Sequence, residues 1–226
     1  MPELVNYRRN DLVSTITMDD GKVNVFSIPM LRALHQAFDQ AERDRTVVLL
    51  TGRPGYFSAG FDLAVFSGPP GDVVVILRLG ATLAERILSF PAPVAVACTG
   101  HAFPAGAFLL MAADTRIGAN GPFKLGLNEV RIGLTLPRFA IVLARHRLTP
   151  AHFDHAAVTG VMFDPPGARE AGLLDAVVAP DQIETVAAAA AGDLAAVDRR
   201  AHAATKLRVR QGVLNELRAS IVAELT

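Results

Sequence analysis

Two short segments of the sequence place small residues where strands should give way to helices. They are Phe57-Ser58-Ala59-Gly60-Phe61-Asp62-Leu63 and Gly100-His101-Ala102-Phe103-Pro104-Ala105-Gly106-Ala107. A turn at the N-terminus of a helix leaves backbone N–H groups without partners, and small side chains let a ligand oxygen approach them. Two such turns could together form an oxyanion hole. Glycine-bearing turns after strands are also common packing features, so the pattern by itself leaves a purely structural role open.

Other catalytic patterns are absent from the sequence or do not fit it. Neither a phosphate-binding loop ending in Lys-Ser/Thr nor a dinucleotide-binding glycine fingerprint occurs. Ser58 is not expected to be a nucleophile, because one extra residue separates it from Gly55 compared with a nucleophile elbow. His152 and His155 have no third ligand nearby, and Cys98 is the only cysteine, so we expect neither a metal site nor a disulfide.

The charge balance and the apolar segments narrow the range of partners. The chain has 22 basic and 22 acidic residues and a formal net charge of zero, so neither nucleic acid nor an anionic membrane is an expected partner. Residues 1–10 lack the apolar core of a signal peptide, which makes the cytoplasm the expected location. Residues 87–113 contain no Asp, Glu, Lys or Arg and exceed the roughly 20 residues that span a bilayer. Pro91, Pro93 and Gly100 interrupt this segment, so we expect buried elements there and no membrane span.

The spacing of apolar residues predicts the elements that position the two turns. Residues 12–18 alternate as a strand does, and the turn at 19–22 predicts that a hairpin or tight return follows. Ser27 is expected to cap a helix that ends near Arg45. The remaining elements expected in this half are a buried strand at 46–51, a loop at 67–71 followed by a helix to about residue 90, a buried strand at 93–99, a tight turn at 100–105 and a buried helix at 106–113.

After Thr149-Pro150 the sequence becomes rich in alanine and helical in pattern. A short strand is expected at 176–178, followed by two helices at about 181–197 and 199–224. The alternation of strands and helices before this tail predicts an α/β fold. The tail itself has the pattern of a helical appendage.

The two turns belong to a longer series of motifs that resembles a known family. Asp20-Gly21-Lys22-Val23-Asn24-Val25-Phe26-Ser27, then residues 57–63, then residues 100–106 and Asp114 resemble, in order and spacing, the signatures of the crotonase superfamily, which includes the enoyl-CoA hydratase/isomerase family. The match extends from about residue 10 to residue 180. The combination of Pro104-Ala105-Gly106 with Gly126-Leu127-Asn128-Glu129 is particularly similar to the 3,2-trans-enoyl-CoA isomerases.

This resemblance implies a fold, an assembly and a substrate. The fold would be a ClpP-like spiral of β-β-α units over residues 1–180, with a C-terminal helical trimerisation region over residues 181–226. The assembly would be a homotrimer or a dimer of trimers. The substrate would be an acyl-CoA thioester, with coenzyme A as part of the substrate and no separate cofactor.

The resemblance also implies roles for individual residues. The thioester oxygen would be held by the N–H groups of Phe61 and Ala105, where Ala105 takes a position usually held by glycine. The substrate pocket would include Ala59, Gly60, Phe108 and Leu127. Val23 and Val25 would contact coenzyme A.

Hydration in this family usually employs two glutamates, and this sequence matches only one of them. Glu129 corresponds to the second, whereas Phe108 stands at the position of the first and cannot transfer a proton. One carboxylate is enough to move a double bond from C3 to C2, because the same base can remove a proton at C2 and return it at C4. We therefore expect an isomerase, with an enoyl-CoA hydratase and a non-catalytic acyl-CoA-binding protein as alternatives.

The remaining charged residues of interest have simpler expected roles. Asp62 and Asp114 are expected to be structural acceptors or caps. Lys206, Arg208 and Arg210 could meet the phosphates of coenzyme A, but a run of charges on a helix is usually a solvated face, so we do not include them in the site.

Overall fold

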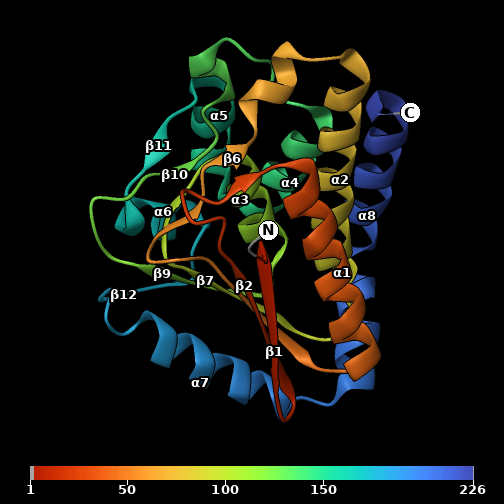
Figure 1. Ribbon diagram of the computed structural model, residues 1–226, viewed down its shortest axis with the longest axis vertical. Helices are drawn as coiled ribbons and strands as arrows, with labels where there is room; N and C mark the ends of the chain where they lie inside the picture. Colours follow the sequence, from red (N-terminus) through yellow and green to blue (C-terminus); the bar gives the residue numbers. More distant parts are fainter. Residues whose placement is uncertain (1–2, 226) are drawn as a thin grey trace.

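The computed structural model describes residues 3–225, so Met1, Pro2 and Thr226, which the predicted ranges include, lie outside the described residues. The largest sheet of the described chain has six strands in the order β1-β2-β4-β7-β9-β12 (Figure 1). These strands are β1 (Val5–Asn10), β2 (Val13–Met18), β4 (Val47–Thr51), β7 (Val94–Cys98), β9 (Thr115–Ala119) and β12 (Ala176–Val178). β1 and β2 pair antiparallel, and every other neighbouring pair in this sheet is parallel.

Short strands form two further sheets beside the main one. The order in the larger is β11-β10-β8-β5, and β3 pairs with β6 in the smaller. Their bounds are β3 (Val25–Phe26), β5 (Gly55–Ser58), β6 (Gly60–Phe61), β8 (Gly100–Ala102), β10 (Leu125–Gly126) and β11 (Met162–Phe163). A strand of the main sheet is thus followed by a strand of the second sheet and then by a helix, as in β7-β8-α3. This repetition produces a spiral of β-β-α units.

Helices cover both faces of the main sheet. The α-helices are α1 (Ile28–Asp44), α2 (Pro70–Ser89), α3 (Pro104–Ala112), α4 (Arg138–Arg147), α5 (Pro150–Thr159), α6 (Pro165–Ala171), α7 (Ile183–Ala195) and α8 (Arg199–Leu225), and the short 3₁₀ helices are η1 (Leu63–Ser67) and η2 (Glu129–Ile132). α3 is buried from Ala105 to Ala112, and its neighbours α2 and α4 both pack against α8. α7 lies under the opposite face, against β4, β7 and β9 (Figure 1). None of the helices in the described chain is long and apolar enough to cross a membrane.

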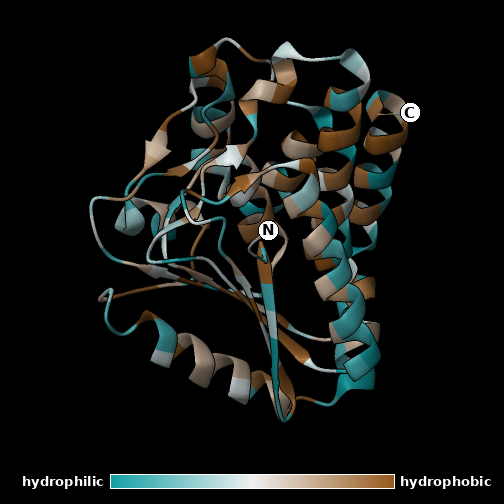
Figure 2. Ribbon diagram, in the orientation of Figure 1, coloured by the Kyte–Doolittle hydropathy of each residue, from teal (hydrophilic) through white to brown (hydrophobic). Residues whose placement is uncertain are grey.

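Local sequence signals explain several of these boundaries. The Ser27 side chain accepts a hydrogen bond from the Met30 N–H and caps α1, as predicted. α1 ends at Asp44, and the next residue, Arg45, adopts a left-handed conformation and donates its N–H to the Ala41 and Glu42 carbonyl oxygens. Hydrophilic and hydrophobic bands alternate along α1 and α8 in Figure 2, as they should on helices that bury one face.

Two predicted boundaries are wrong. The partner of strand β2 precedes it: β1 ends at Asn10, and the chain reverses at Asp11, which has a positive φ. Residues 19–22 lead instead to β3, which pairs with β6. The segment 100–105 is not simply a turn, because Gly100–Ala102 forms β8 between β5 and β10, and α3 already begins at Pro104. Proline is favoured at the first position of a helix, because a backbone N–H there would have no acceptor within the helix and proline has none to lose.

The charged run on α8 is not a solvated face. Lys206 and Arg210 are only 6% and 9% exposed, and both contact the carboxylate of Asp114 at 2.8 and 2.9 Å. Asp114 also accepts a hydrogen bond from the Val94 N–H, so it is the structural acceptor that the sequence predicted. Arg208, by contrast, is exposed. The buried pair fastens α8 to the strands and helices of the core.

Candidate active site

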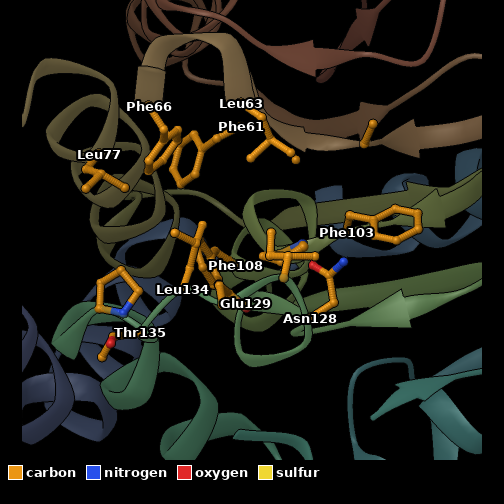
Figure 3. Close-up of a pocket in the computed structure, with 15 residues that line it drawn as sticks. Phe61, Leu63, Phe66, Leu77, Phe103, Phe108, Asn128, Glu129, Leu134 and Thr135 are labelled. Carbon is orange, nitrogen blue, oxygen red and sulfur yellow. The ribbon is translucent and has the colours of Figure 1, made fainter. Parts of the chain in front are cut away.

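A cavity of about 380 Å³ lies where the two small-residue turns meet the segment around Glu129 (Figure 3). Its wall is mostly apolar, and Glu129 is the only ionisable residue among the residues that line it. The lining residues are Ala59, Gly60, Phe61, Leu63, Phe66, Leu77, Phe103, Pro104, Phe108, Asn128, Glu129, Ile132, Leu134, Thr135 and Pro137. Apolar concave sites with a few polar groups are the usual form of small-molecule sites.

Glu129 is a buried carboxylate that begins the short helix η2. Its residue surface is only 7% exposed, and its Oε2 atom is buried without a hydrogen-bond partner. Burial raises the pKa of Glu129 from its ordinary value of 4.5 to about 7, and a hydrogen bond from its own backbone N–H opposes this rise. The Leu134 N–H donates to the Glu129 carbonyl oxygen at 2.9 Å, which holds the backbone of this segment. A carboxyl group in this state can exchange a proton near neutral pH.

The first turn is fixed by the side chains of Ser58 and Asn24. The Ser58 hydroxyl donates to the Asn24 carbonyl oxygen at 2.8 Å and accepts from the Gly60 N–H at 3.0 Å. The Asn24 side-chain amide donates to the Phe57 carbonyl oxygen at 3.3 Å. Gly60 itself has a φ of +90°, which side-chain-bearing residues rarely adopt. Ser58 is therefore committed to structure, as its poor match to a nucleophile elbow indicates.

The Phe61 N–H points away from β3. The Asp62 N–H donates to the Phe26 oxygen at 3.2 Å across the β3–β6 pair. Successive N–H groups of an extended strand point in opposite directions, so that of Phe61 points to the other side of β6.

The second turn contributes the N-terminus of α3. No side chain caps this helix, and the N–H of Ala105, at its second position, has no acceptor within the helix. The Phe103 N–H donates to the Ser58 carbonyl oxygen at 2.9 Å, which joins the second turn directly to the first. A Cβ atom on Gly106 would lie only 3.0 Å from the Ser58 Cβ, so the glycine permits this close approach.

The structure brings together most of the residues that the sequence nominates. Ala59, Gly60, Phe61, Phe108 and Glu129 all line the cavity. Ala105 is buried beside the lining residue Pro104.

Three nominated residues lie elsewhere. Leu127 belongs to the hydrophobic core and does not line the cavity. Val23 and Val25 also lie outside the cavity wall, where the Val23 oxygen accepts from the Ala59 N–H and the Val25 N–H donates to Asp20. Contact of these two residues with coenzyme A stays a prediction.

Sequence reasoning missed two parts of the cavity wall. Leu134, Thr135 and Pro137 follow η2, and Phe66 and Leu77 come from η1 and α2. No motif marks these residues, because they reach the cavity only through the packing of η1, η2 and α2 around α3. Among residues 3–225 no group of three or more His, Cys, Asp and Glu residues is placed to hold a metal ion.

Comparisons with known proteins give a consistent result. A family profile described as enoyl-CoA hydratase/isomerase matches residues 8–226. An enoyl-CoA hydratase/isomerase family protein from Pseudomonas syringae superimposes with a TM-score of 0.96 at 45% identity, covering 98% of this chain and 96% of that one. Enoyl-CoA hydratase EchA3 from Mycobacterium ulcerans superimposes with a TM-score of 0.94 at 40% identity, covering 96% of each chain. Human mitochondrial enoyl-CoA delta isomerase 1 is 26% identical over 210 residues, which are 91% of this chain and 70% of that protein.

Proposed function

The chain belongs to the enoyl-CoA hydratase/isomerase family, and we propose that it is an isomerase that moves the double bond of a 3-enoyl-CoA to the 2-position. Family membership confirms the crotonase resemblance seen in the sequence, and the TM-scores of 0.96 and 0.94 confirm the predicted fold class. The relatives are named both isomerase and hydratase, so the choice between these reactions rests on the site itself.

The observation that carries the proposal is the single buried carboxylate in an otherwise non-ionisable cavity. Glu129 in its ionised form removes the proton from C2 of the 3-enoyl thioester, and the electron pair left on C2 delocalises into the adjacent thioester carbonyl on one side and over the C3–C4 double bond to C4 on the other. The protonated Glu129 then returns the proton to C4, which leaves a double bond between C2 and C3. No proton is gained or lost overall, so one residue with a pKa of about 7 suffices.

Two backbone N–H groups would stabilise the dienolate intermediate. The negative charge of this intermediate concentrates on the thioester oxygen, and fixed donors aimed at that oxygen lower the barrier without reorganising. The Phe61 N–H, which points away from β3, and the Ala105 N–H at the start of α3 are the proposed donors. The Phe103–Ser58 hydrogen bond supports this role, because it fixes the distance between the two turns.

A hydratase is the second candidate, and Phe108 disfavours it. Hydration as the family usually performs it needs a second acid or base at this position, and the Phe108 ring packs edge-on against Phe139 at 5.3 Å with no proton to transfer. The other polar residues of the wall, Asn128 and Thr135, do not titrate near neutral pH. A non-catalytic acyl-CoA-binding protein is the third candidate, and only turnover separates it from the first.

The proposal includes an assembly and a cofactor requirement. We propose a homotrimer or a dimer of trimers that uses residues 181–226, where Val209 on α8 is 73% exposed and would gain from being covered. The reaction needs no cofactor beyond the coenzyme A of the substrate. Sedimentation velocity tests the assembly, and a monomer at micromolar concentration would contradict it. A cytoplasmic location stays a prediction.

The test of the reaction compares the wild-type protein with Glu129→Gln and with a matched control, Glu170→Gln, at an exposed position on α6. The substrates are a cis-3-enoyl-CoA and a trans-2-enoyl-CoA. We expect the wild type and the control to isomerise the 3-enoyl substrate, and Glu129→Gln to lose at least about 100-fold in kcat, the lower end of general acid–base contributions.

Other results would favour the alternatives. Hydration of the 2-enoyl substrate without isomerisation would favour a hydratase. Calorimetric binding of acyl-CoA without either reaction would favour a binding protein. Full isomerase activity in Glu129→Gln would refute the assignment of the base.

A further inference from the structure

Gly80 occupies an unusual position in the middle of the long helix α2. Glycine lowers helix stability relative to alanine at interior positions, so a glycine there needs a reason in the surrounding packing. Gly80 is buried, and Leu77, which lies one turn earlier on the same helix, lines the cavity. Residues three apart on a helix share a face, so Gly80 is on the side of α2 that faces the cavity.

The packing reason is the aromatic ring of Phe61. A Cβ atom at position 80 would lie 2.5 Å from Cζ and 2.6 Å from Cε1 of Phe61, closer than real contacts allow. The ring therefore rests directly on the bare backbone of α2.

The backbone of Phe61 cannot easily move to relieve such a contact. It is held in β6 by pairing with β3, and the Asp62 N–H donates to the Phe26 oxygen at 3.2 Å. The Asp62 side chain also caps η1 by accepting from the Ala64 N–H at 3.1 Å. A side chain at position 80 would thus displace the ring of Phe61 and leave its N–H in place.

A displaced ring would move into the cavity. Phe61 and Phe108 both line the cavity, with their ring centroids 6.2 Å apart. Phe108 cannot retreat, because it is fully buried and packs edge-on against Phe139. The gap between the rings of Phe61 and Phe108 would therefore narrow.

This gap divides the cavity along its length. Figure 3 places Phe103 and Asn128 at one end and Phe66 and Leu77 at the other, with Phe61 and Phe108 between them. The end that contains Phe103 adjoins the two turns with the proposed N–H donors, whereas Phe66 and Leu77 at the opposite end are apolar. An acyl chain whose thioester lies at the turns must pass between Phe61 and Phe108 to reach Phe66 and Leu77.

We propose that Gly80 is a specificity-determining residue, because the space it leaves for the Phe61 ring keeps open the passage through which the distal part of a long acyl chain enters the cavity. The inference rests on the proposed function in that the cavity must hold an acyl chain. It goes further in assigning the choice of chain length to a residue on α2 that lines no part of the cavity.

The test compares Gly80→Ala with Gly71→Ala, a matched control on the same helix where an added Cβ meets nothing within 4 Å. Turnover of 3-hexenoyl-CoA and 3-dodecenoyl-CoA is measured for each protein, and binding of hexanoyl-CoA and dodecanoyl-CoA is measured by calorimetry. We expect Gly80→Ala to lose about tenfold or more in kcat/KM on the long substrate relative to the short one, a size typical of steric discrimination in apolar pockets. The ratio should stay unchanged in Gly71→Ala.

A double variant tests the inference even if Gly80→Ala folds poorly. Phe61→Leu retains the backbone N–H and removes the ring atoms that meet position 80, so the double variant Gly80→Ala/Phe61→Leu should fold and restore the ratio of long-chain to short-chain kcat/KM, whatever its absolute activity. An equal loss on both substrates, or no change in their ratio, would overturn the inference and leave the proposed function standing. Failure of the wild-type protein to bind either saturated thioester would overturn the proposed function and the inference with it.

Discussion

The burial of Glu129 predicts that the proposed catalytic base destabilises the protein in a pH-dependent way. Replacing it with glutamine removes the ionisable group and keeps the size of the side chain. Glutamine stays neutral at every pH, so the variant shows how much larger the free energy of unfolding would be without a buried carboxylate. The difference in stability between the two proteins therefore measures the cost of holding this base in an apolar cavity.

The size of this cost follows from the pKa. Folding raises the pKa of Glu129 from 4.5 to about 7, and each unit corresponds to about 1.36 kcal/mol. Below pH 4.5 the carboxyl group is protonated in both the folded and the unfolded states, so its ionisation does not lower the free energy of unfolding. Between pH 4.5 and pH 7 the unfolded state loses its proton first, and above pH 7 the full penalty of about 3 kcal/mol applies. Glu129→Gln should thus be more stable than the wild type by about that amount at pH 8.

Urea unfolding at pH 4 and pH 8, at one protein concentration, tests this expectation. At pH 8 the gain should also raise Tm by roughly 6–12 °C for a chain of this size. Glu170→Gln should match the wild type at both pH values, because Glu170 is exposed. A difference between wild type and Glu129→Gln that is the same at both pH values, or a variant that is less stable at pH 8, would refute the reasoning.

Two further predictions concern the same residue and the buried ion pairs. The kcat/KM for isomerisation should rise with pH around a midpoint near 7, because only the ionised Glu129 accepts the proton from C2; a midpoint below pH 5 in a pH–rate profile would contradict a buried base. Asp114→Asn should lower the free energy of unfolding by about 3–5 kcal/mol in urea titrations, because it leaves the charges of Lys206 and Arg210 buried without their partner. The control Asp193→Asn, at an exposed site on α7, should change little, and a loss below about 1 kcal/mol in Asp114→Asn would indicate an ordinary surface pair.

The sequence predicted those elements whose length gives a clear pattern. The buried run at 46–51 forms β4 within Val47–Thr51, and the helix expected from Ser27 to about Arg45 is α1. Strands of two residues, such as β3 and β6, are too short to show any alternation. They form because other parts of the chain bring them together, which no local pattern records.

The N-terminal hairpin was missed for a different reason. Its turn contains Asn10-Asp11, residue types that favour turns, and Asp11 takes up a positive φ. The signal was present in the sequence, but only one face of β1 is covered, so its apolar pattern is weak.

Composition alone predicted only part of the candidate site. The two turns stood out by composition, whereas Glu129 was found through the family resemblance. The raised pKa of Glu129 depends on its burial, which exists only once separate elements pack around the cavity. The hydrogen bond from Phe103 to Ser58 that joins the turns likewise exists only in the folded chain.

Buried cations from two helices, Arg147 on α4 and Arg210 on α8, contact the C-terminal end of α3. Arg147 donates to the Met111 and Ala113 carbonyl oxygens at 3.0 and 2.9 Å, and Arg210 donates to the Ala112 oxygen at 3.5 Å. Positive charge at the C-terminal end of a helix complements its dipole and satisfies carbonyl groups that have no partner within the helix. The N-terminus of the same helix has no side-chain cap, and its first residue, Pro104, lines the cavity.

Of the charged run on α8, Arg210 takes part in this contact, whereas Lys206 donates to the Ala92 carbonyl oxygen and to Asp114. Asp114 balances the buried charges of Lys206 and Arg210 where α8 meets the core. A buried base opposes folding, and the apolar packing beneath α8, where Leu214 and Leu217 are buried, helps to offset this cost.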